Sequence, residues 1–311
     1  MSAGQVSGSR LLAETARAPL SPGQVAPAVV DDADLERASA GRAIRVGSVA
    51  VPRRVARVPL EVYVAQVLAG EGEPGANEAA TQALAVAVRT YLIANAGRHG
   101  RDGYDFCDST HCQVPRRATA ATRRAAAATT NLVLRYRGAP AEVFYSASCG
   151  GRSEAAATMW PGTNAPYLES VADDVHEDDA PWTLNVSLAE VRTALARAGI
   201  EASGVEDVRV ASRTASGRVA RLWLGGPAQV TVTGSQFRMA LGAAVVRSTA
   251  FTIERTGDRW RLVGHGYGHG VGMCVIGAGR RAARGDTSTA ILAHYFPGLQ
   301  LAPLDRPLTS R

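Results

Sequence analysis

The stretch Val58–Glu71, VPLEVYVAQVLAGE, decides the fold, because its apolar residues recur with the period of a helix. Pro59 suits the first turn of a helix, where a missing backbone N–H costs nothing. Gly70 predicts the end of this helix, with Glu71 in the loop that follows. One face is apolar and is predicted to be buried, and it carries Leu60, Tyr63, Val64, Val67 and Leu68.

A second helix is predicted over Glu78–Ala96. Asn77 is a good N-cap for it, and Gly97 is a typical stop. The run Ala83–Val88 is small and apolar on every side, which predicts that this helix is central and buried.

Outside this helix pair the pattern predicts short strands and further helices, so we expect an α+β fold. Around the pair we expect a third helix over 119–130 and strands within Arg45–Val58, Thr129–Tyr136 and Ala141–Ala147. From about 186 the pattern changes to a second α+β unit, with elements at Leu188–Arg197, 205–213, 217–224, 234–242 and a hairpin at Thr256-Gly257-Asp258.

Glycine-rich motif sequence resumes only at 264, so the second unit reads as an insertion into the first. The expected organisation is a low-order leader (1–43), a helical and stranded core (44–185 and 263–302), a smaller inserted α+β subdomain (186–262) and a tail (303–311).

The chain has 311 residues and a net charge of +6. A mild basic excess attracts polyanions, among them nucleic acid, anionic lipid and bacterial wall polymers. Basic residues form no long run and do not alternate with aromatics, so nucleic acid is not the expected partner. No apolar stretch approaches the roughly 20 residues of a membrane span, and Met1–Ala40 shows no apolar signal core.

The segment Gly70–Pro74, GEGEP, places Glu71 and Glu73 between the two apolar helices. A carboxylate at a cleft mouth is partly desolvated, which raises its pKa toward the range that a general acid near neutral pH requires. An ordinary acidic loop between helices is the alternative interpretation.

The segment Tyr104–Gln113, YDFCDSTHCQ, holds Cys107, His111 and Cys112 within six residues. Two thiolates and an imidazole so close together suit tetrahedral zinc, with His99 or a water molecule as the fourth ligand. A disulfide between the two cysteines is the alternative.

The segment Gly264–Gly272, GHGYGHGVG, presents His265, Tyr267 and His269 on one glycine-rich loop. Glycine permits positive φ and close approach of a ligand. The loop lacks the surroundings of a dinucleotide fingerprint and the Gly-Lys-Ser/Thr ending of a phosphate loop. We expect a functional loop of another kind.

Taken together, these motifs resemble the family of stage II sporulation protein D and the amidase-enhancer protein LytB. The resemblance extends from about Val58 to Leu301. It rests on the ordered motifs VPLEVYVAQVLAGE, ALAVAVRTY, YDFCDSTHCQ, FYSASCGGRSE and GHGYGHGVGMC, closed by the tail ILAHYFPGLQL.

This resemblance implies a peptidoglycan lytic transglycosylase, which cleaves the glycan between N-acetylmuramic acid and N-acetylglucosamine and leaves a 1,6-anhydro end. The family's essential glutamate precedes the Arg-Thr-Tyr helix, and the matching position is Glu71, with Glu73 as runner-up. The zinc seen in the family maps onto the Cys/His segment and implies a structural role. Candidates for substrate contacts are Arg89, Tyr91, Gln113, Ser148, His265, Tyr267 and His269.

Two other functions stay open at this point. One is a non-catalytic, peptidoglycan-binding amidase enhancer, whose partners are glycan strands and a cell-wall amidase. The other is a metal-dependent hydrolase that uses the Cys/His segment. The resemblance implies a location in the cell envelope, periplasmic or extracellular. The chain departs from the family at Val275, where a glutamine is usual, and at Gly72, where a methionine or small polar residue is usual.

Overall fold

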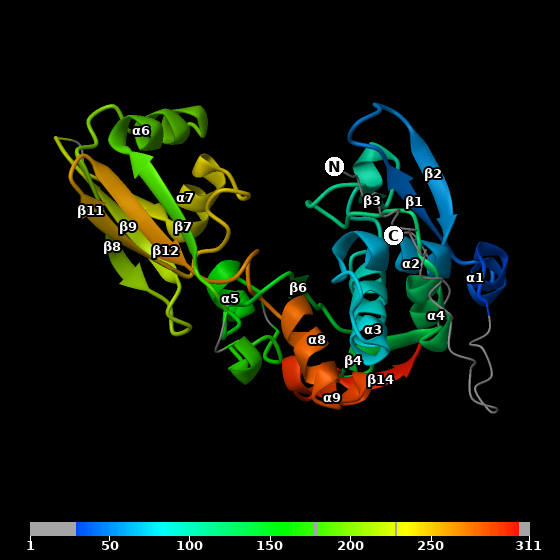
Figure 1. Ribbon diagram of the computed structural model, residues 1–311. Helices are drawn as coiled ribbons and strands as arrows, with labels where there is room; N and C mark the ends of the chain where they lie inside the picture. The colour runs from blue at the N-terminus through cyan, green and yellow to red at the C-terminus, as the bar shows by residue number, and fades with distance from the viewer. Residues whose placement is uncertain (1–28, 164, 177–178, 228, 305–311) are drawn as a thin grey trace, which may run out of the picture.

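The computed structural model describes residues 29–163, 165–176, 179–227 and 229–304, which form two lobes (Figure 1). The first lobe contains α1 (Asp32–Ala38), β1 (Ala43–Gly47), β2 (Val55–Pro59), α2 (Leu60–Glu71), α3 (Glu78–Ala94), β3 (Phe106–Cys107), α4 (Ala120–Ala128), β4 (Leu132–Tyr136), β5 (Ala139–Pro140), β6 (Tyr145–Ser146), α5 (Ala156–Met159), β13 (Met273–Cys274), α8 (Val275–Ala283), α9 (Ser288–Tyr295) and β14 (Gln300–Pro303). The second contains β7 (Trp182–Ser187), α6 (Leu188–Arg197), β8 (Asp207–Arg213), β9 (Val219–Gly225), β10 (Val230–Thr233), α7 (Gly234–Leu241), β11 (Phe251–Thr256) and β12 (Arg259–Gly264). The predicted α+β class is confirmed.

Helices α2 and α3 form the centre of the first lobe, as their sequences predict. Asn77 caps α3 by accepting a hydrogen bond from the N–H of Ala79, and every residue of Ala83–Val88 is buried. One boundary differs from the prediction. Helix α2 continues through Gly70, so Glu71 is its last residue and does not lie in the following loop.

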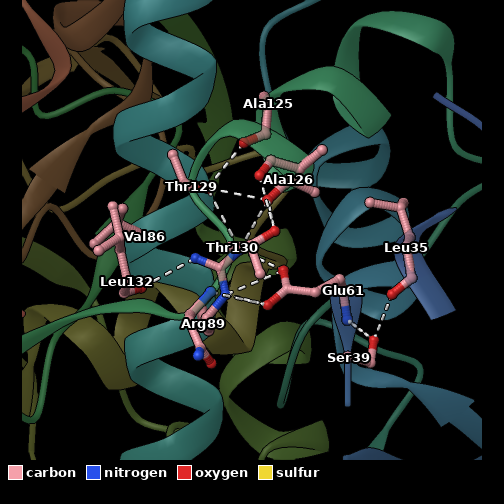
Figure 2. Close-up of polar contacts among 12 residues, drawn as sticks. Leu35, Ser39, Glu61, Val86, Arg89, Ala125, Ala126, Thr129, Thr130 and Leu132 are labelled. Carbon is pink, nitrogen blue, oxygen red and sulfur yellow. Dashed lines mark hydrogen bonds and ion pairs between the residues drawn. The ribbon is translucent and has the colours of Figure 1, made fainter. Parts of the chain in front are cut away.

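A buried ion pair joins α2 to α3 (Figure 2). The Arg89 guanidinium donates to both carboxylate oxygens of Glu61, at 3.0 Å from Nε to Oε1, and also to the carbonyl of Leu132. Both side chains are fully buried. Removing either partner would leave an uncompensated buried charge, so this pair locks the two helices in one arrangement.

The start of the described chain is ordered, contrary to the predicted low-order leader. Residues 1–28 lie outside the described residues, but α1 packs on α2 through the fully buried Leu35. Ser39 accepts a hydrogen bond from the N–H of Glu61 and donates to the carbonyl of Leu35 (Figure 2). Part of the expected leader therefore belongs to the first lobe.

The strands predicted within Thr129–Tyr136 and Ala141–Ala147 do not pair with each other. Strand β4 pairs antiparallel with β5 on one edge and with β14 on the other. Strand β6 instead pairs in parallel with β13. This long-range pairing brings the FYSASCGG segment beside the glycine-histidine loop.

The second lobe has its own buried cluster of apolar residues, with Trp260, Phe237 and Leu222 among its fully buried members. Its strands form two three-stranded antiparallel sheets, in the orders β10-β9-β8 and β11-β12-β7. Helix α6 has the limits that the sequence predicts, whereas β7 begins before the expected boundary at 186. Among the described residues, no helix is long and apolar enough to cross a membrane.

Candidate functional site

A cleft of about 820 Å³ is lined by residues of both lobes. The first lobe contributes the end of α2, the Cys/His segment and the residues around β6, and the second contributes α7 and the residues after it. The glycine-histidine loop adds Tyr267, Gly268 and His269. Figure 1 shows α7 on the side of the second lobe that faces the first.

Glu71 lies in this cleft at the C-terminal end of α2. Its Oε1 accepts a 2.6 Å hydrogen bond from the backbone N–H of Val114, and its carboxyl group also bonds the hydroxyl of Tyr145. Burial raises the pKa of Glu71, and these two hydrogen bonds oppose the rise. A carboxyl group with a raised pKa that still faces a cleft is suited to proton transfer near neutral pH.

Gly70 explains why Glu71 reaches this position. A Cβ at residue 70 would lie only 1.8 Å from the carbonyl oxygen of Val114. The absence of a side chain therefore lets the segment after the Cys/His motif run against the last turn of α2. The neighbouring N–H of that segment then meets the Glu71 carboxylate. Gly70 permits this approach and does not end the helix.

Tyr145 and Gln113 extend the hydrogen-bond network of Glu71. The Gln113 side-chain amide donates to the Tyr145 hydroxyl at 2.9 Å, and Gln113 is almost fully buried. Gln113 therefore acts on the site through Tyr145. Burial also raises the pKa of Tyr145, so its hydroxyl stays protonated at neutral pH and can donate to Glu71. Tyr145 lies in the FYSASCGGRSE motif, but nothing local in the sequence marks it as part of the site.

The runner-up glutamate, Glu73, lies elsewhere. It is exposed and borders a separate cavity of about 320 Å³. Its Oε2 lies against Gly279 on α8. A Cβ added to Gly279 would be only 2.8 Å from this oxygen. Of the two carboxylates in the GEGEP segment, Glu71 is the one in the interlobe cleft.

The Cys/His segment gathers four donor side chains, which are His99, Cys107, His111 and Cys112. The Nδ1 atom of His111 lies 3.7 Å and 3.6 Å from the two sulfur atoms and 3.3 Å from Nε2 of His99. Both cysteines are free thiols, so the alternative disulfide is not present in this structure. The group could hold a metal ion, and two of its members also line the cleft.

The glycine-histidine loop pairs with the FYSASCGG segment through two backbone hydrogen bonds between Ser148 and Tyr267, of 2.9 and 3.0 Å. Tyr267 is half exposed in the cleft. His269 is partly buried on the cleft wall, with its ring edge-to-face against Trp160 at 5.3 Å. Burial, together with smaller effects of the nearby Arg218 and Arg238, lowers the pKa of His269 to about 4, so the ring is neutral at pH 7.

Four of the predicted substrate contacts do not line the cleft, and one of them is Gln113, which is buried and reaches the site through Tyr145. Arg89 is fully buried and paired with Glu61, which corrects the expectation that it touches substrate. Ser148 is also buried, and its backbone holds the glycine-histidine loop. His265 is exposed but does not line the cleft.

Aromatic and cationic side chains complete the lining. Tyr91 accepts a hydrogen bond from Arg98 at 3.2 Å, and both residues face the cleft. Phe144 and Trp160 pack together with ring centroids 4.5 Å apart. Apart from Tyr91, these residues could not be predicted from the sequence, because side chains that lie far apart along the chain carry no local signal that they meet.

The fold and the site thus define a two-lobed α+β protein with a partly buried glutamate in an aromatic cleft, next to a cluster of potential metal ligands. Residues 52–136 match the family model described as stage II sporulation protein (SpoIID), and residues 176–272 match a domain of unknown function (DUF8618). The resemblance to the stage II sporulation protein D and amidase-enhancer family is therefore confirmed.

Named relatives agree with this match. The chain is 28% identical to stage II sporulation protein D of Bacillus amyloliquefaciens over 272 residues, which cover 81% of this chain and 76% of that protein. It is 27% identical to the Bacillus subtilis protein of the same name over equal shares. It is also 28% identical to the Bacillus subtilis amidase enhancer, over 71% of this chain and 38% of that protein.

Proposed function

We propose that this protein is a peptidoglycan lytic transglycosylase with Glu71 as its acid and base. The observation that carries the proposal is the Glu71 carboxyl group, which lies in a cleft, has a raised pKa and is held by two hydrogen bonds. Glycoside hydrolysis of the common type requires two carboxylates at a suitable distance. A lytic transglycosylase requires only one.

The reaction divides into two proton transfers by the same residue. Protonated Glu71 gives its proton to the glycosidic oxygen as the bond to C1 of the muramic sugar breaks. The carboxylate left behind takes the proton of the C6 hydroxyl, whose oxygen closes the bond to C1 and forms the 1,6-anhydro ring. A raised pKa favours the first step, and the conjugate base serves the second.

The surrounding residues support both steps. The N–H of Val114 and the hydroxyl of Tyr145 stabilise the carboxylate after it has lost its proton. Phe144 and Trp160 offer apolar surface on which a sugar ring can lie. Tyr91, Tyr267 and His269 line the same cleft and are the remaining candidates for substrate contacts.

We also propose that the Cys/His group binds a structural zinc ion. With Zn–S near about 2.3 Å and Zn–N near about 2.0–2.1 Å, a tetrahedron has donor–donor edges of roughly 3.3–3.8 Å. The separations of 3.3, 3.6 and 3.7 Å fit these edges. Nδ1 of His99 bonds Asp102 at 2.8 Å, as metal-binding histidines usually bond a carboxylate. Four protein donors fill the tetrahedron, which favours a structural site over a metal-dependent hydrolase.

An amidase enhancer remains the second candidate, because one relative carries that name. In that role the cleft would bind glycan without cleaving it, and a cell-wall amidase would be the partner. Both candidates place the protein in the cell envelope.

The two candidates are distinguished by the products of digestion. We expect purified glycan strands incubated with the protein to yield fragments that end in 1,6-anhydro-muramic acid, detected by mass spectrometry. Binding to the strands with no fragments, together with stimulation of an added amidase, would contradict the enzyme and support the enhancer.

A further inference from the structure

The second lobe contributes a cation, Arg238 of α7, to the cleft. Its Nε donates to the carbonyls of Val246 and Arg247 at 3.0 and 3.2 Å, and its Nη2 donates to that of Ala243 at 3.5 Å. These acceptors are neutral backbone groups, which fix the position of the guanidinium. Among the residues that the structure describes, the third nitrogen, Nη1, has one hydrogen-bond acceptor, the sulfur atom of Met239 at 3.9 Å.

Within the described parts of the chain, no carboxylate forms an ion pair with Arg238. The ionisable group that favours the charged form of Arg238 is a phenol, that of Tyr267, rather than a carboxylate. Burial lowers the pKa of Arg238 because the charged form loses solvation. A partly buried cation without a counter-charge is unfavourable. An anion that enters the cleft and pairs with it is therefore stabilised there.

Arg238 is also close to the aromatic part of the cleft. Its charge helps to lower the pKa of His269. The ring of His269 lies against Trp160, and Trp160 packs on Phe144. The positive charge thus lies beside the surface on which a sugar ring would rest. The match to the sporulation family model ends at residue 136, so Arg238 belongs to the part of the chain that this model does not describe.

We propose that Arg238 binds a carboxylate carried by the glycan, so that the substrate class is an anionic glycan rather than a neutral one. This inference rests on the proposed function and adds the group that the second lobe recognises. Guanidinium groups suit carboxylates because their N–H donors lie in one plane and their charge strengthens each hydrogen bond. The carboxylate is either that of a muramic lactyl group without peptide or one of a stem peptide.

The test measures binding in a Glu71→Gln background, in which strands are not consumed. Three ligands of equal length are compared: peptide-free strands, the same strands with their carboxylates converted to amides, and peptide-bearing strands. Arg238→Met should weaken binding of the carboxylate ligand roughly tenfold, the effect of one hydrogen bond to a charged group. It should leave binding of the amidated strands unchanged.

A matched control and a second variant keep the result interpretable. Arg247→Met removes an exposed positive charge of the same segment that does not line the cleft, and should change none of the affinities. Where Arg238→Met fails to fold, Arg238→Gln keeps donors for the backbone carbonyls but not the charge, and should show the same loss.

The outcomes separate the sources and the hypotheses. If Arg238→Met loses affinity for peptide-free strands, the bound group is the muramic carboxylate. If it loses affinity only for peptide-bearing strands, the bound group is a carboxylate of the stem peptide. Equal affinity of the parent and Arg238 variants for every strand overturns the inference and leaves the proposed function standing. If the Glu71→Gln parent binds no strand at all, the proposed function fails, and this inference fails with it.

Discussion

The carboxylate of Glu71 and the backbone N–H of Val114 form a 2.6 Å hydrogen bond between the end of a helix and a segment 43 residues further along the chain. This bond favours the charged form of a group whose burial favours the neutral form. The balance leaves a carboxyl group that can release and regain a proton. The same contact links the site to the Cys/His segment, because Val114 follows Cys112 by two residues.

Glu71→Gln is expected to abolish glycan cleavage and to preserve glycan binding. Glutamine keeps the size of the side chain and can accept the hydrogen bond from Val114, but it has no proton to transfer. Loss of acid and base catalysis costs roughly 10²- to 10⁴-fold in rate. The measurement is the initial rate of 1,6-anhydro product formation. Glu73→Gln is the matched control, and a comparable loss there would move the assignment to Glu73.

Tyr145→Phe is expected to shift the pH profile of cleavage. The hydroxyl stabilises the carboxylate of Glu71 and so lowers its pKa, and removing it raises that pKa further. The acid form then persists to higher pH, so the falling limb of the kcat/KM profile should move upward. Rates on glycan strands at a series of pH values test this. A uniform loss of activity with an unmoved limb would mean that Tyr145 has only a structural role.

Gly70→Ala is expected to lower stability and displace the catalytic carboxylate. The new Cβ would overlap the carbonyl of Val114, so α2 and the facing segment must separate. Overpacking of this kind costs about 1–3 kcal/mol of unfolding free energy. Gly100→Ala is the control, since a Cβ there meets nothing within 4 Å. Equal denaturant midpoints for the two variants would contradict the close contact.

Whether a feature of this fold can be predicted from the sequence depends on how far apart along the chain the interacting residues lie. Helix limits such as Asn77 at the start of α3 could be predicted, because capping and apolar periodicity are local. The pairing of β6 with β13 could not, since it joins segments more than a hundred residues apart. Arg89 belongs to a prominent sequence motif, which suggested a contact with substrate, but it forms a buried ion pair with Glu61 inside the protein.

Stability should also depend on the charge of Glu71. Its folded-state pKa is raised above the ordinary value of 4.5, so folding is favoured while the group is protonated. That contribution is complete below the ordinary pKa and is lost as the pH rises through the folded-state pKa. Glu71→Gln cannot ionise, so its melting temperature should exceed that of the parent at pH 8 and match it more closely at pH 4. A parent that is the more stable of the two at pH 8 would show that Glu71 is not destabilised by its charge.

The zinc proposal predicts about one metal ion per chain and a loss of stability when it is removed. The four donors come from the segment after α3, from β3 and from the turn that follows β3, and a bound metal would join them, so chelation should lower the melting temperature. Asp102→Asn weakens the hydrogen bond that orients His99 and should reduce metal affinity roughly 10- to 100-fold. Asp108→Asn is the matched control, because Asp108 bonds Ser48 and Val49 and not the donors.

Two measurements check this prediction, metal content of the purified protein and competition with a chelating dye. Equal affinities of the Asp102 and Asp108 variants would remove His99 from the set of ligands. A protein without metal, in which mass spectrometry finds Cys107 and Cys112 joined as a disulfide, would reject the site altogether. Because Cys112 lies two residues before Val114, loss of metal should also disturb the hydrogen bond to Glu71. Cleavage and melting temperature are therefore expected to fall together as the chelator removes the ion.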